Sequence, residues 1–544
     1  MKRNGMCPVC FIKQLFTRRQ AVTDLYSAKP YPVNACIAPP MGWSSWNTFK
    51  NRIDEDLIYE QAVCMKEKGL AEAGYTYVNL DDNWHSSSRD ANGKLQGDLA
   101  TFAGGIPKLV EKINALGLKV GIYSSNGTET CEDLPASLHR ERIDAKTFAE
   151  WGIEYFKYDF CHNEKLSEYA PLIYGISVSK RGERAEKFYP VTEAELYGAA
   201  RLMSAKNLPV DKYLSGIDRN GGSAVFKVTA ETDGEYVVTL NVYKKGRYPK
   251  CALLLINDEE DYIVEAPSQK HWNYTARFQC VVKLKAGENK IKVFNPVFKR
   301  ADSAMLQYRY MGKQLIEAAK SVAEATEKPV KPITFSICEW GVNRPYEWGA
   351  TAGNLWRTTP DIRPNWKWMM FIYKMNVDRY QYSSVGHYND PDMLEVGNGT
   401  LSYDENFAHF AVWCMMAAPL ILGNDLRAMP DNVLKIVTDK QLIAIDQDPL
   451  GKAAKRVIKS FGADILARPL SDGSTAVCFF NKFGGEKDMT LSLATLINDA
   501  YVALPKAKAY VAEEVGGESA EITETLTARL RVHSARVFIL KPKA

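Results

Sequence analysis

The sequence predicts an α/β protein: a (β/α)8 TIM barrel, an all-β domain inserted after its fourth strand, and a C-terminal antiparallel β-sandwich. Two observations predict the barrel. Short apolar strands alternate with amphipathic helices, which is the pattern of a parallel sheet covered by helices. About eight such strands occur, and eight βα units close into a barrel whose ligand site lies at the carboxyl ends of the strands.

The eight strands are expected in two groups separated by the insert. Helices are predicted after most of them, for example over 54–68, 107–116 and 366–373. The expected strands lie within 41–49, 75–80, 118–123, 154–161, 333–337, 355–361, 384–394 and 419–422.

The chain has 544 residues, which is more than one ordinary domain holds. Between about 176 and 298, alternating strands separated by Gly, Asn and Asp turns indicate the inserted β-sandwich. From about residue 452 the chain is again rich in strands. We therefore predict an N-terminal extension (1–35), a barrel in two parts (36–173 and 308–450), the insert (174–307) and the C-terminal domain (451–544).

The charge balance excludes several classes of partner. With 69 basic and 65 acidic residues, the net charge of +4 gives no reason to expect nucleic acid or an anionic membrane as a partner.

The N-terminal segment lacks the apolar core of a signal peptide, and no apolar run is long enough to cross a bilayer. Eleven scattered cysteines favour reduced thiols and a cytoplasmic location. Cys7 and Cys10 form half a zinc motif without a second half, which favours an exposed turn.

The fourth strand, Glu154–Cys161, carries a lysine and an aspartate two residues apart. Side chains alternate along a strand, so Lys157 and Asp159 point to the same side. Burying charge is costly unless the charge is paired or used. A buried ion pair that only holds the fold is the alternative to a functional role.

Polar and aromatic residues gather at the expected strand ends, and most of the polar ones are carboxylates. Carboxylates accept hydrogen bonds from vicinal hydroxyls, and aromatic rings cover the C–H face of a sugar, so the set suits a neutral polyhydroxylated ligand. Because no Ser–His pair, phosphate loop or Cys/His cluster appears, we expect no cofactor and no metal. The set is Trp43, Asp81, Asp82, Tyr123, Lys157, Asp159, Glu339, Trp340, Arg357, Asp361, Asp390 and Asp392.

Two carboxyl groups across one glycosidic bond are the minimum equipment for glycoside hydrolysis. Lys157 is expected to lower the pKa of Asp159, which makes Asp159 the candidate nucleophile. Spacing leaves the acid open among four carboxylates: Glu339, Asp361, Asp390 and Asp392. Binding of Mg²⁺ or Ca²⁺ by Asp81–Asp82 or by Asn389–Asp392 is a further alternative, as is a plain helix cap.

Seven ordered motifs, which span the chain outside the insert, resemble those of glycoside hydrolase family 27, the α-galactosidase family. They are Met41–Asn47, Asn79–Trp84, Gly121–Tyr123, Lys157–Cys161, Ile337–Gly341, Trp356–Asp361 and Asn389–Leu394. The chain departs from the family at Asn83, where animal members have cysteine, and at Tyr388, where tryptophan is common.

The resemblance implies a retaining mechanism, with Asp159 as nucleophile and Asp361 as acid/base. It implies a disulfide between Cys131 and Cys161 at the pocket edge, although a reducing cytoplasm would oppose that bond. The insert is similar in style to carbohydrate-binding modules. The substrate-binding residues implied are Trp43, Asp81, Asp82, Tyr123, Lys157, Cys338, Glu339, Trp340, Arg357 and Asp392.

The function expected is that of a retaining exo-α-galactosidase. An α-N-acetylgalactosaminidase and a β-L-arabinopyranosidase are alternatives on the same scaffold. A sugar-binding protein without catalysis is the alternative from another class, and the presence of both carboxylates argues against it. The insert is expected either to contact the substrate beyond galactose or to act as a spacer or homo-oligomer interface.

Overall fold

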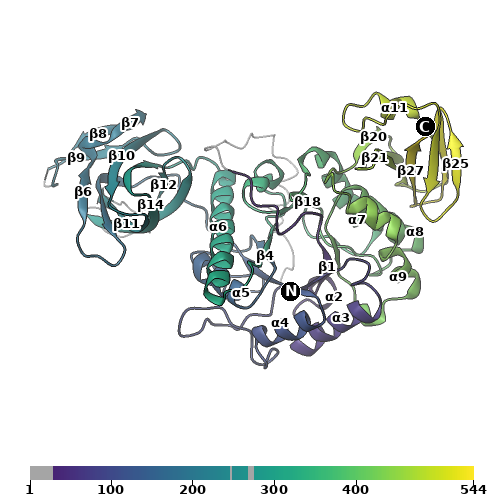
Figure 1. Cartoon of the computed structure of the whole chain (residues 1–544), viewed down its shortest axis with the longest axis horizontal. Coiled ribbons are helices and arrows are strands. Elements are labelled where there is room, and N and C mark those ends of the chain that lie inside the picture. Colours follow the sequence, from purple (N-terminus) through teal and green to yellow (C-terminus); the bar gives the residue numbers. More distant parts are fainter. Residues whose placement is uncertain (1–28, 207, 245–247, 267–274, 544) are drawn as a thin grey trace. The chain divides into compact units, whose positions relative to one another are not determined.

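The computed structural model describes residues 29–206, 208–244, 248–266 and 275–543 (Figure 1). The N-terminal segment with Cys7 and Cys10 lies outside these residues. Two compact units are present. One comprises Pro30–Asn163 with Met311–Ala544, and the other contains Glu164–Tyr310.

The barrel predicted from the sequence is confirmed. Its strands pair in parallel in their order along the chain, and a parallel bridge between Leu394 and Leu422 closes the ring between the seventh and eighth strands. The strands are β1 (Met41–Ser44), β2 (Tyr77–Leu80), β3 (Lys119–Ser125), β4 (Tyr155–Asp159), β16 (Thr334–Ile337), β17 (Leu355–Arg357), β18 (Tyr388–Asp390) and β19 (Leu420–Leu422).

Helices connect the strands, and several begin at a capping side chain. Asp54 accepts a hydrogen bond from the backbone N–H of Leu57, and Ser402 forms a capping box with Glu405. The helices are α2 (Trp46–Phe49), α3 (Glu55–Glu67), α4 (Ile106–Ala115), α5 (Glu141–Glu150), α6 (Arg300–Thr326), α7 (Trp366–Asn376), α8 (Tyr403–Met415), α9 (Asp431–Val437) and α10 (Lys440–Asp446).

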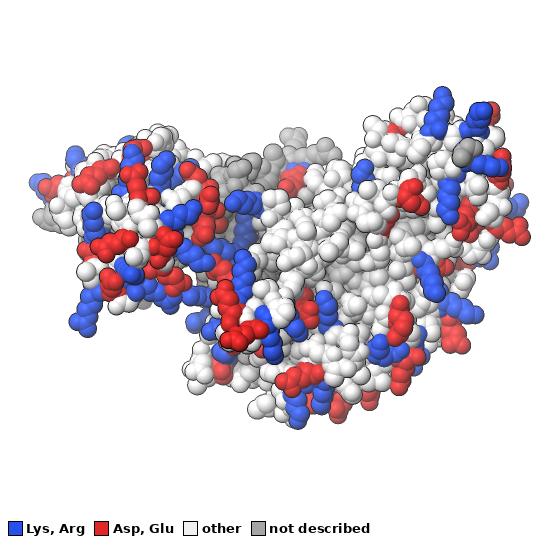
Figure 2. All heavy atoms as spheres, in the orientation of Figure 1, with Lys and Arg blue, Asp and Glu red and all other residues white. Residues whose placement is uncertain are grey.

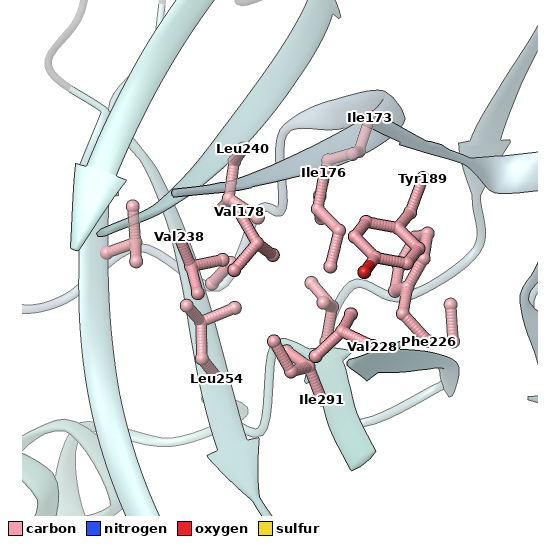
Figure 3. Packing of buried hydrophobic residues seen from close by; sticks show 14 of the residues in the cluster. Ile173, Ile176, Val178, Tyr189, Phe226, Val228, Val238, Leu240, Leu254 and Ile291 are labelled. Carbon is pink, nitrogen blue, oxygen red and sulfur yellow. The ribbon is translucent and has the colours of Figure 1, made fainter. Parts of the chain in front are cut away.

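The insert is a β-sandwich, as predicted. A five-stranded and a six-stranded antiparallel sheet enclose one apolar core, in which Val238 of one sheet and Leu254 of the other are buried (Figure 3). The predicted boundary at residue 174 falls within β5. The strands are β5 (Leu172–Lys180), β6 (Lys187–Pro190), β7 (Glu195–Gly198), β8 (Arg201–Ser204), β9 (Lys212–Ser215), β10 (Gly222–Ala230), β11 (Gly234–Lys244), β12 (Lys250–Ile256), β13 (Glu260–Ala266), β14 (Ala276–Leu284) and β15 (Gly287–Phe294).

The C-terminal domain is the predicted antiparallel β-sandwich, built from a six-stranded and a two-stranded sheet. Buried side chains such as Val477 and Leu526 form its core. Its elements are β20 (Lys455–Lys459), β21 (Ala463–Pro469), β22 (Thr475–Asn481), β23 (Lys487–Ser492), α11 (Leu493–Ile497), β24 (Tyr510–Glu514), β25 (Ser519–Ile522), β26 (Thr525–Leu530) and β27 (Ala535–Pro542).

Acidic and basic side chains intermingle on the face shown in Figure 2, as the near balance of charge in the sequence leads one to expect. Among the described residues, no helix combines the length and apolar character that crossing a membrane requires.

Candidate active site

The carboxyl ends of the barrel strands bring the expected polar residues together. Lys157 and Asp159 lie on β4, and Asp81 follows β2 directly. Arg357 ends β17, and Asp390 ends β18. One small cavity is lined by four of these residues, together with Asp392, and it leaves Asp159 outside its lining. The topology of the barrel therefore gathers cations and carboxylates from strands that are far apart in the sequence.

Lys157 pairs with Asp81. Its Nζ lies 2.8 Å from Oδ2 of Asp81 and 5.3 Å from the centre of the Tyr123 ring. Ser44 also donates to Oδ2 of Asp81, at 3.3 Å. Both members of the pair are largely buried, so each charge needs the other.

The charge of Lys157 lowers the pKa of Asp159, as predicted, but the sequence did not show that burial has the larger and opposite effect. Burial raises the pKa of Asp159 to about 6, and the nearby charge of Lys157 opposes that shift only in part. The negative charge of Asp361 adds to the rise. Desolvation therefore outweighs the cation at this carboxyl, although Asp159 remains mostly ionised above pH 6.

Arg357 joins two carboxylates across the site. Its Nη2 lies 2.8 Å from Oδ2 of Asp392 and 3.1 Å from Oδ1 of Asp361. Cys338 is also in contact, with its Sγ 3.6 Å from Nη1. The guanidinium is buried, whereas the side chain of Asp361 is 43% exposed. Arg357 therefore holds a carboxylate that is still in contact with solvent.

Asp361 and Asp159 are electrostatic neighbours, because the charge of Asp361 contributes to the raised pKa of Asp159. The two differ sharply in exposure: the carboxylate of Asp159 is buried and that of Asp361 reaches solvent. The site therefore holds one enclosed carboxylate and one that faces water, and a pair of carboxyl groups is what retaining glycoside hydrolysis uses.

Asp82 is buried beside Asp81 and is held by backbone N–H groups. Asn83 donates to its Oδ1 at 2.8 Å, and Glu132 donates to its Oδ2 at 3.1 Å. Burial raises the pKa of Asp82 to about 7. His85, which the sequence analysis did not single out, lies with Nδ1 3.7 Å from Asp82, and burial lowers the pKa of this imidazole to about 3. The sequence gives no signal for His85, because it is a single histidine that belongs to none of the seven motifs.

The aromatic and acidic residues expected to line the pocket have distinct surroundings. The indole of Trp43 is fully buried and donates to the carbonyl of Asn424 at 2.8 Å. Tyr123 on β3 is buried, and its hydroxyl donates to Sγ of Cys131 at 3.3 Å. The carboxylate of Glu339 accepts hydrogen bonds from the backbone and side chain of Asn343, so it anchors the loop that presents Trp340.

The oxygens of the Asn389–Asp392 segment are engaged by the protein. Asp390 accepts from the backbone N–H of Asp392 at 2.8 Å, and Asp392 accepts from the backbone N–H of Ile362 at 2.8 Å besides pairing with Arg357. These contacts favour a structural and charge-pairing role for the two carboxylates over the alternative of a Mg²⁺ or Ca²⁺ site.

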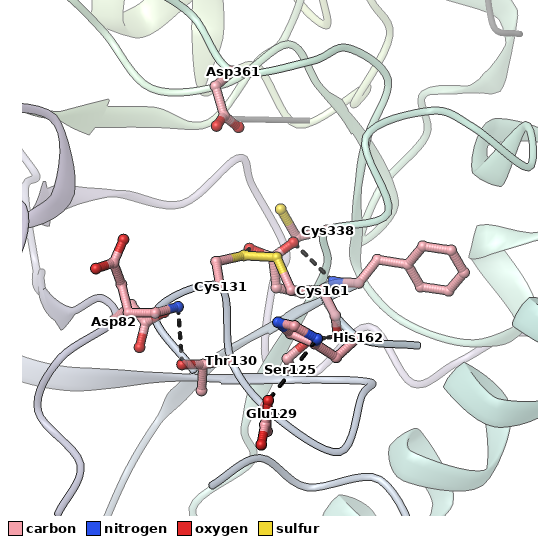
Figure 4. The surroundings of a disulfide bond; sticks show 12 residues. Asp82, Ser125, Glu129, Thr130, Cys131, Cys161, His162, Cys338 and Asp361 are labelled. Carbon is pink, nitrogen blue, oxygen red and sulfur yellow. Dashed lines mark hydrogen bonds and ion pairs between the residues drawn. A yellow bond between two sulfur atoms is a disulfide. The ribbon is translucent and has the colours of Figure 1, made fainter. Parts of the chain in front are cut away.

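A disulfide joins Cys131 to Cys161 at the edge of the site, with their Cα atoms 5.1 Å apart. Figure 4 shows it below the carboxylate of Asp361, with Cys338 beside it. The pairing is the one that the family resemblance implied.

Comparisons with known proteins agree with this geometry. A family model described as alpha galactosidase A matches residues 38–180 and 287–448. A second model, described as the alpha galactosidase C-terminal beta sandwich domain, matches 460–540. The stretch between the two parts of the first match falls in the insert.

Curated relatives extend over most of the chain. The alpha-galactosidase of Cyamopsis tetragonoloba is 28% identical over 532 residues, which cover 97% of this chain and 92% of that protein. Alpha-galactosidase 2 of Arabidopsis thaliana is 30% identical over 461 residues, covering 85% and 79%. The crystal structure of alpha-galactosidase I from Mortierella vinacea shares the fold, with a TM-score of 0.64 at 23% identity over 94% of this chain and 98% of that one. The chain therefore belongs to the α-galactosidase family, glycoside hydrolase family 27, and is a glycoside hydrolase.

Proposed function

We propose that the protein is a retaining exo-α-galactosidase that removes terminal α-linked galactose through a covalent glycosyl–aspartate intermediate. The observation that carries the proposal is the unequal pair of neighbouring carboxylates, buried Asp159 and solvent-facing Asp361. The names of the full-length relatives support galactose as the sugar.

In the first step, a carboxylate oxygen of Asp159 forms a bond to the anomeric carbon as the bond to the leaving oxygen breaks. Asp361 gives its proton to that leaving oxygen. In the second step, Asp361 takes a proton from water, the water oxygen bonds to the anomeric carbon, and Asp159 is released. Each step inverts the anomeric centre, so the product retains the configuration of the substrate.

The paired charges are suited to holding the sugar. A carboxylate accepts hydrogen bonds from hydroxyls and a cation donates to their oxygens. Asp81 with Lys157, and Asp392 with Arg357, offer two such donor–acceptor pairs. In the proposed site they bind the galactose hydroxyls while Asp159 attacks.

The test is a panel of nitrophenyl glycosides combined with two variants. We expect hydrolysis of the α-galactoside to exceed that of the α-N-acetylgalactosaminide and of the β-L-arabinopyranoside. Asp159→Asn should abolish turnover while galactose still binds. Asp133→Asn, which alters an exposed aspartate on the same rim, should keep the activity. Preference for another glycoside in the panel would contradict the proposed specificity for galactose. Full activity of Asp159→Asn would refute the mechanism.

A further inference from the structure

The disulfide between Cys131 and Cys161 lies against the proposed nucleophile. Sγ of Cys131 is 3.7 Å from Oδ2 of Asp159. One potential ligand atom from each of these three residues lies within 4.8 Å of the other two. Figure 4 shows that the carboxylate of Asp361 points toward the same sulfurs.

Two thiolates and a carboxylate are a donor set that suits Zn²⁺. Zinc–sulfur bonds of about 2.3 Å and zinc–oxygen bonds of about 2.0 Å at a tetrahedral angle place sulfur and oxygen about 3.5 Å apart. The separation between Cys131 and Asp159 is close to that value. In the oxidised protein the sulfurs are bonded to each other, so neither is a thiolate and the donor set is incomplete.

The segments that follow β3 and β4, which carry Cys131 and Cys161, are also held together by contacts other than the disulfide. Asn126 donates its backbone N–H to the carbonyl of Asp159 at 2.8 Å, and the hydroxyl of Ser125 donates to the carbonyl of Cys161 at 2.8 Å. A Cβ on Gly127 would lie 1.8 Å from the carbonyl oxygen of Cys161, which shows how closely the backbones pack. These contacts keep the sulfurs and the carboxylate near one another after the sulfur–sulfur bond is broken.

We propose that reduction of the Cys131–Cys161 disulfide creates a Zn²⁺ site formed by the two thiolates and the carboxylate of Asp159. Zinc at this site occupies the carboxylate that must attack the sugar, so the reduced enzyme becomes sensitive to zinc while the oxidised enzyme does not. Only this loss of activity depends on the proposed function. The metal site itself stands on the positions of the three side chains.

The reduction is balanced with a phosphine as the reductant. The phosphorus takes the oxygen of one water molecule and becomes a phosphine oxide, and the two protons of that water and two electrons convert the disulfide into two thiols. Binding of Zn²⁺ then displaces the thiol protons into solvent. A phosphine is preferred to a dithiol for the experiment, because a dithiol would compete for the metal.

A second group of side chains on the same loops must be distinguished from this site. Nε2 of His162 lies 3.2 Å from Oδ1 of Asp133, and Glu129 is close to the same imidazole. All three are exposed and offer nitrogen and oxygen ligands only. Metal bound there would carry no thiolate signature.

The experiment uses Co²⁺ as a spectroscopic substitute for Zn²⁺ on the full chain. We expect a thiolate-to-cobalt charge-transfer band in phosphine-reduced protein, absent from oxidised protein and lost when Zn²⁺ is added. Zinc should also protect Cys131 and Cys161 from alkylation.

Cys131→Ser should lower the affinity for cobalt by at least about tenfold, whereas Asp133→Asn should leave the band intact. In activity assays, zinc should inhibit only the reduced enzyme, and a chelator should restore it.

The outcomes separate this site from the proposed function. A cobalt band in a protein that hydrolyses no galactoside would keep the metal site and refute the function. A reduced protein that retains its far-ultraviolet circular dichroism but shows no thiolate band would overturn the site. Unfolding on reduction would overturn it as well, because the proposal requires the loops to stay assembled.

Discussion

Nζ of Lys157 on β4 lies 2.8 Å from Oδ2 of Asp81 at the end of β2, and the ring of Tyr123 on β3 lies close to the same ammonium. The lysine thus spans three neighbouring strands of the barrel. This ion pair fixes a carboxylate in the base of the site, while Asp159 keeps a raised pKa.

Replacing Lys157 by methionine should lower both the stability of the protein and its catalytic activity. The change leaves the buried carboxylate of Asp81 without its cation, which costs about 3–5 kcal/mol when one partner of a buried pair is removed. We expect a fall of that size in the free energy of unfolding, measured by chemical denaturation, and a large loss in kcat/KM.

Lys119→Met on the neighbouring strand β3 is the matched control. Lys119 is 45% exposed and pairs with Glu154 at 3.1 Å. Lys331 lies 3.7 Å from the same carboxylate, so Glu154 keeps a cation when Lys119 is replaced. Loss of a half-exposed partner should therefore cost less than about 1 kcal/mol, and this variant should remain close to wild type in stability. Equal losses in the two variants would contradict the importance given to burial of the Lys157 pair.

The pH dependence of activity should reflect the raised pKa of Asp159. The nucleophile must be ionised, and burial raises its pKa to about 6. We therefore expect kcat/KM for a nitrophenyl α-galactoside to fall as the pH drops below about 6. An acid limb near the ordinary aspartate pKa of 3.8 would show that Asp159 is not desolvated in solution.

The same shift predicts that Asp159→Asn stabilises the protein at neutral pH. A raised folded-state pKa favours the folded state below the unfolded pKa of 3.8, and this contribution is lost as the pH rises through about 6. Above that pH the buried charge costs roughly 3 kcal/mol relative to the unfolded chain. The stability gain of the variant should therefore grow between pH 4 and pH 7. A gain that does not change with pH would contradict this explanation.

The sequence predicted the barrel well because its signal is repeated. Each short apolar strand ends in polar residues, and the eight strands pair in chain order, so the gathering of Asp81, Lys157, Arg357 and Asp390 follows from topology alone. The insert was equally visible, since its strands alternate with period two around buried residues such as Val228.

Contacts between side chains were beyond the reach of the sequence. Lys157 is two residues from Asp159 along the chain, yet it forms its ion pair with Asp81, which is 76 residues away. The sign of the pKa shift at Asp159 depends on how far burial outweighs a nearby cation, and spacing carries no measure of burial. The place of His85 beside Asp82 likewise depends on packing rather than on a motif.

Asp361→Ala should impair the two chemical steps unequally. Loss of general acid–base catalysis costs about 10²–10⁴-fold. A substrate with a good leaving group needs little protonation, so its first step should be nearly normal and the glycosyl–enzyme should accumulate. Azide should accelerate the second step and yield the α-galactosyl azide. No rescue, or a β-azide product, would argue against Asp361 as the acid/base of a retaining enzyme.

Asp464 of the C-terminal domain should contribute to stability without affecting catalysis. It is fully buried, and its carboxylate accepts a hydrogen bond from Tyr373 of α7 at 2.9 Å and pairs with Lys482 at 2.8 Å. Asp464→Asn leaves Lys482 as a buried cation without its anion, which costs about 3–5 kcal/mol.

Asp378→Asn is the matched control, because Asp378 is 61% exposed and pairs with Arg456, which also contacts Asp464. The control should lose less than about 1 kcal/mol. Thermal unfolding measured alongside KM distinguishes the two variants, and a change in KM for Asp464→Asn in folded protein would show that this contact also shapes the active site.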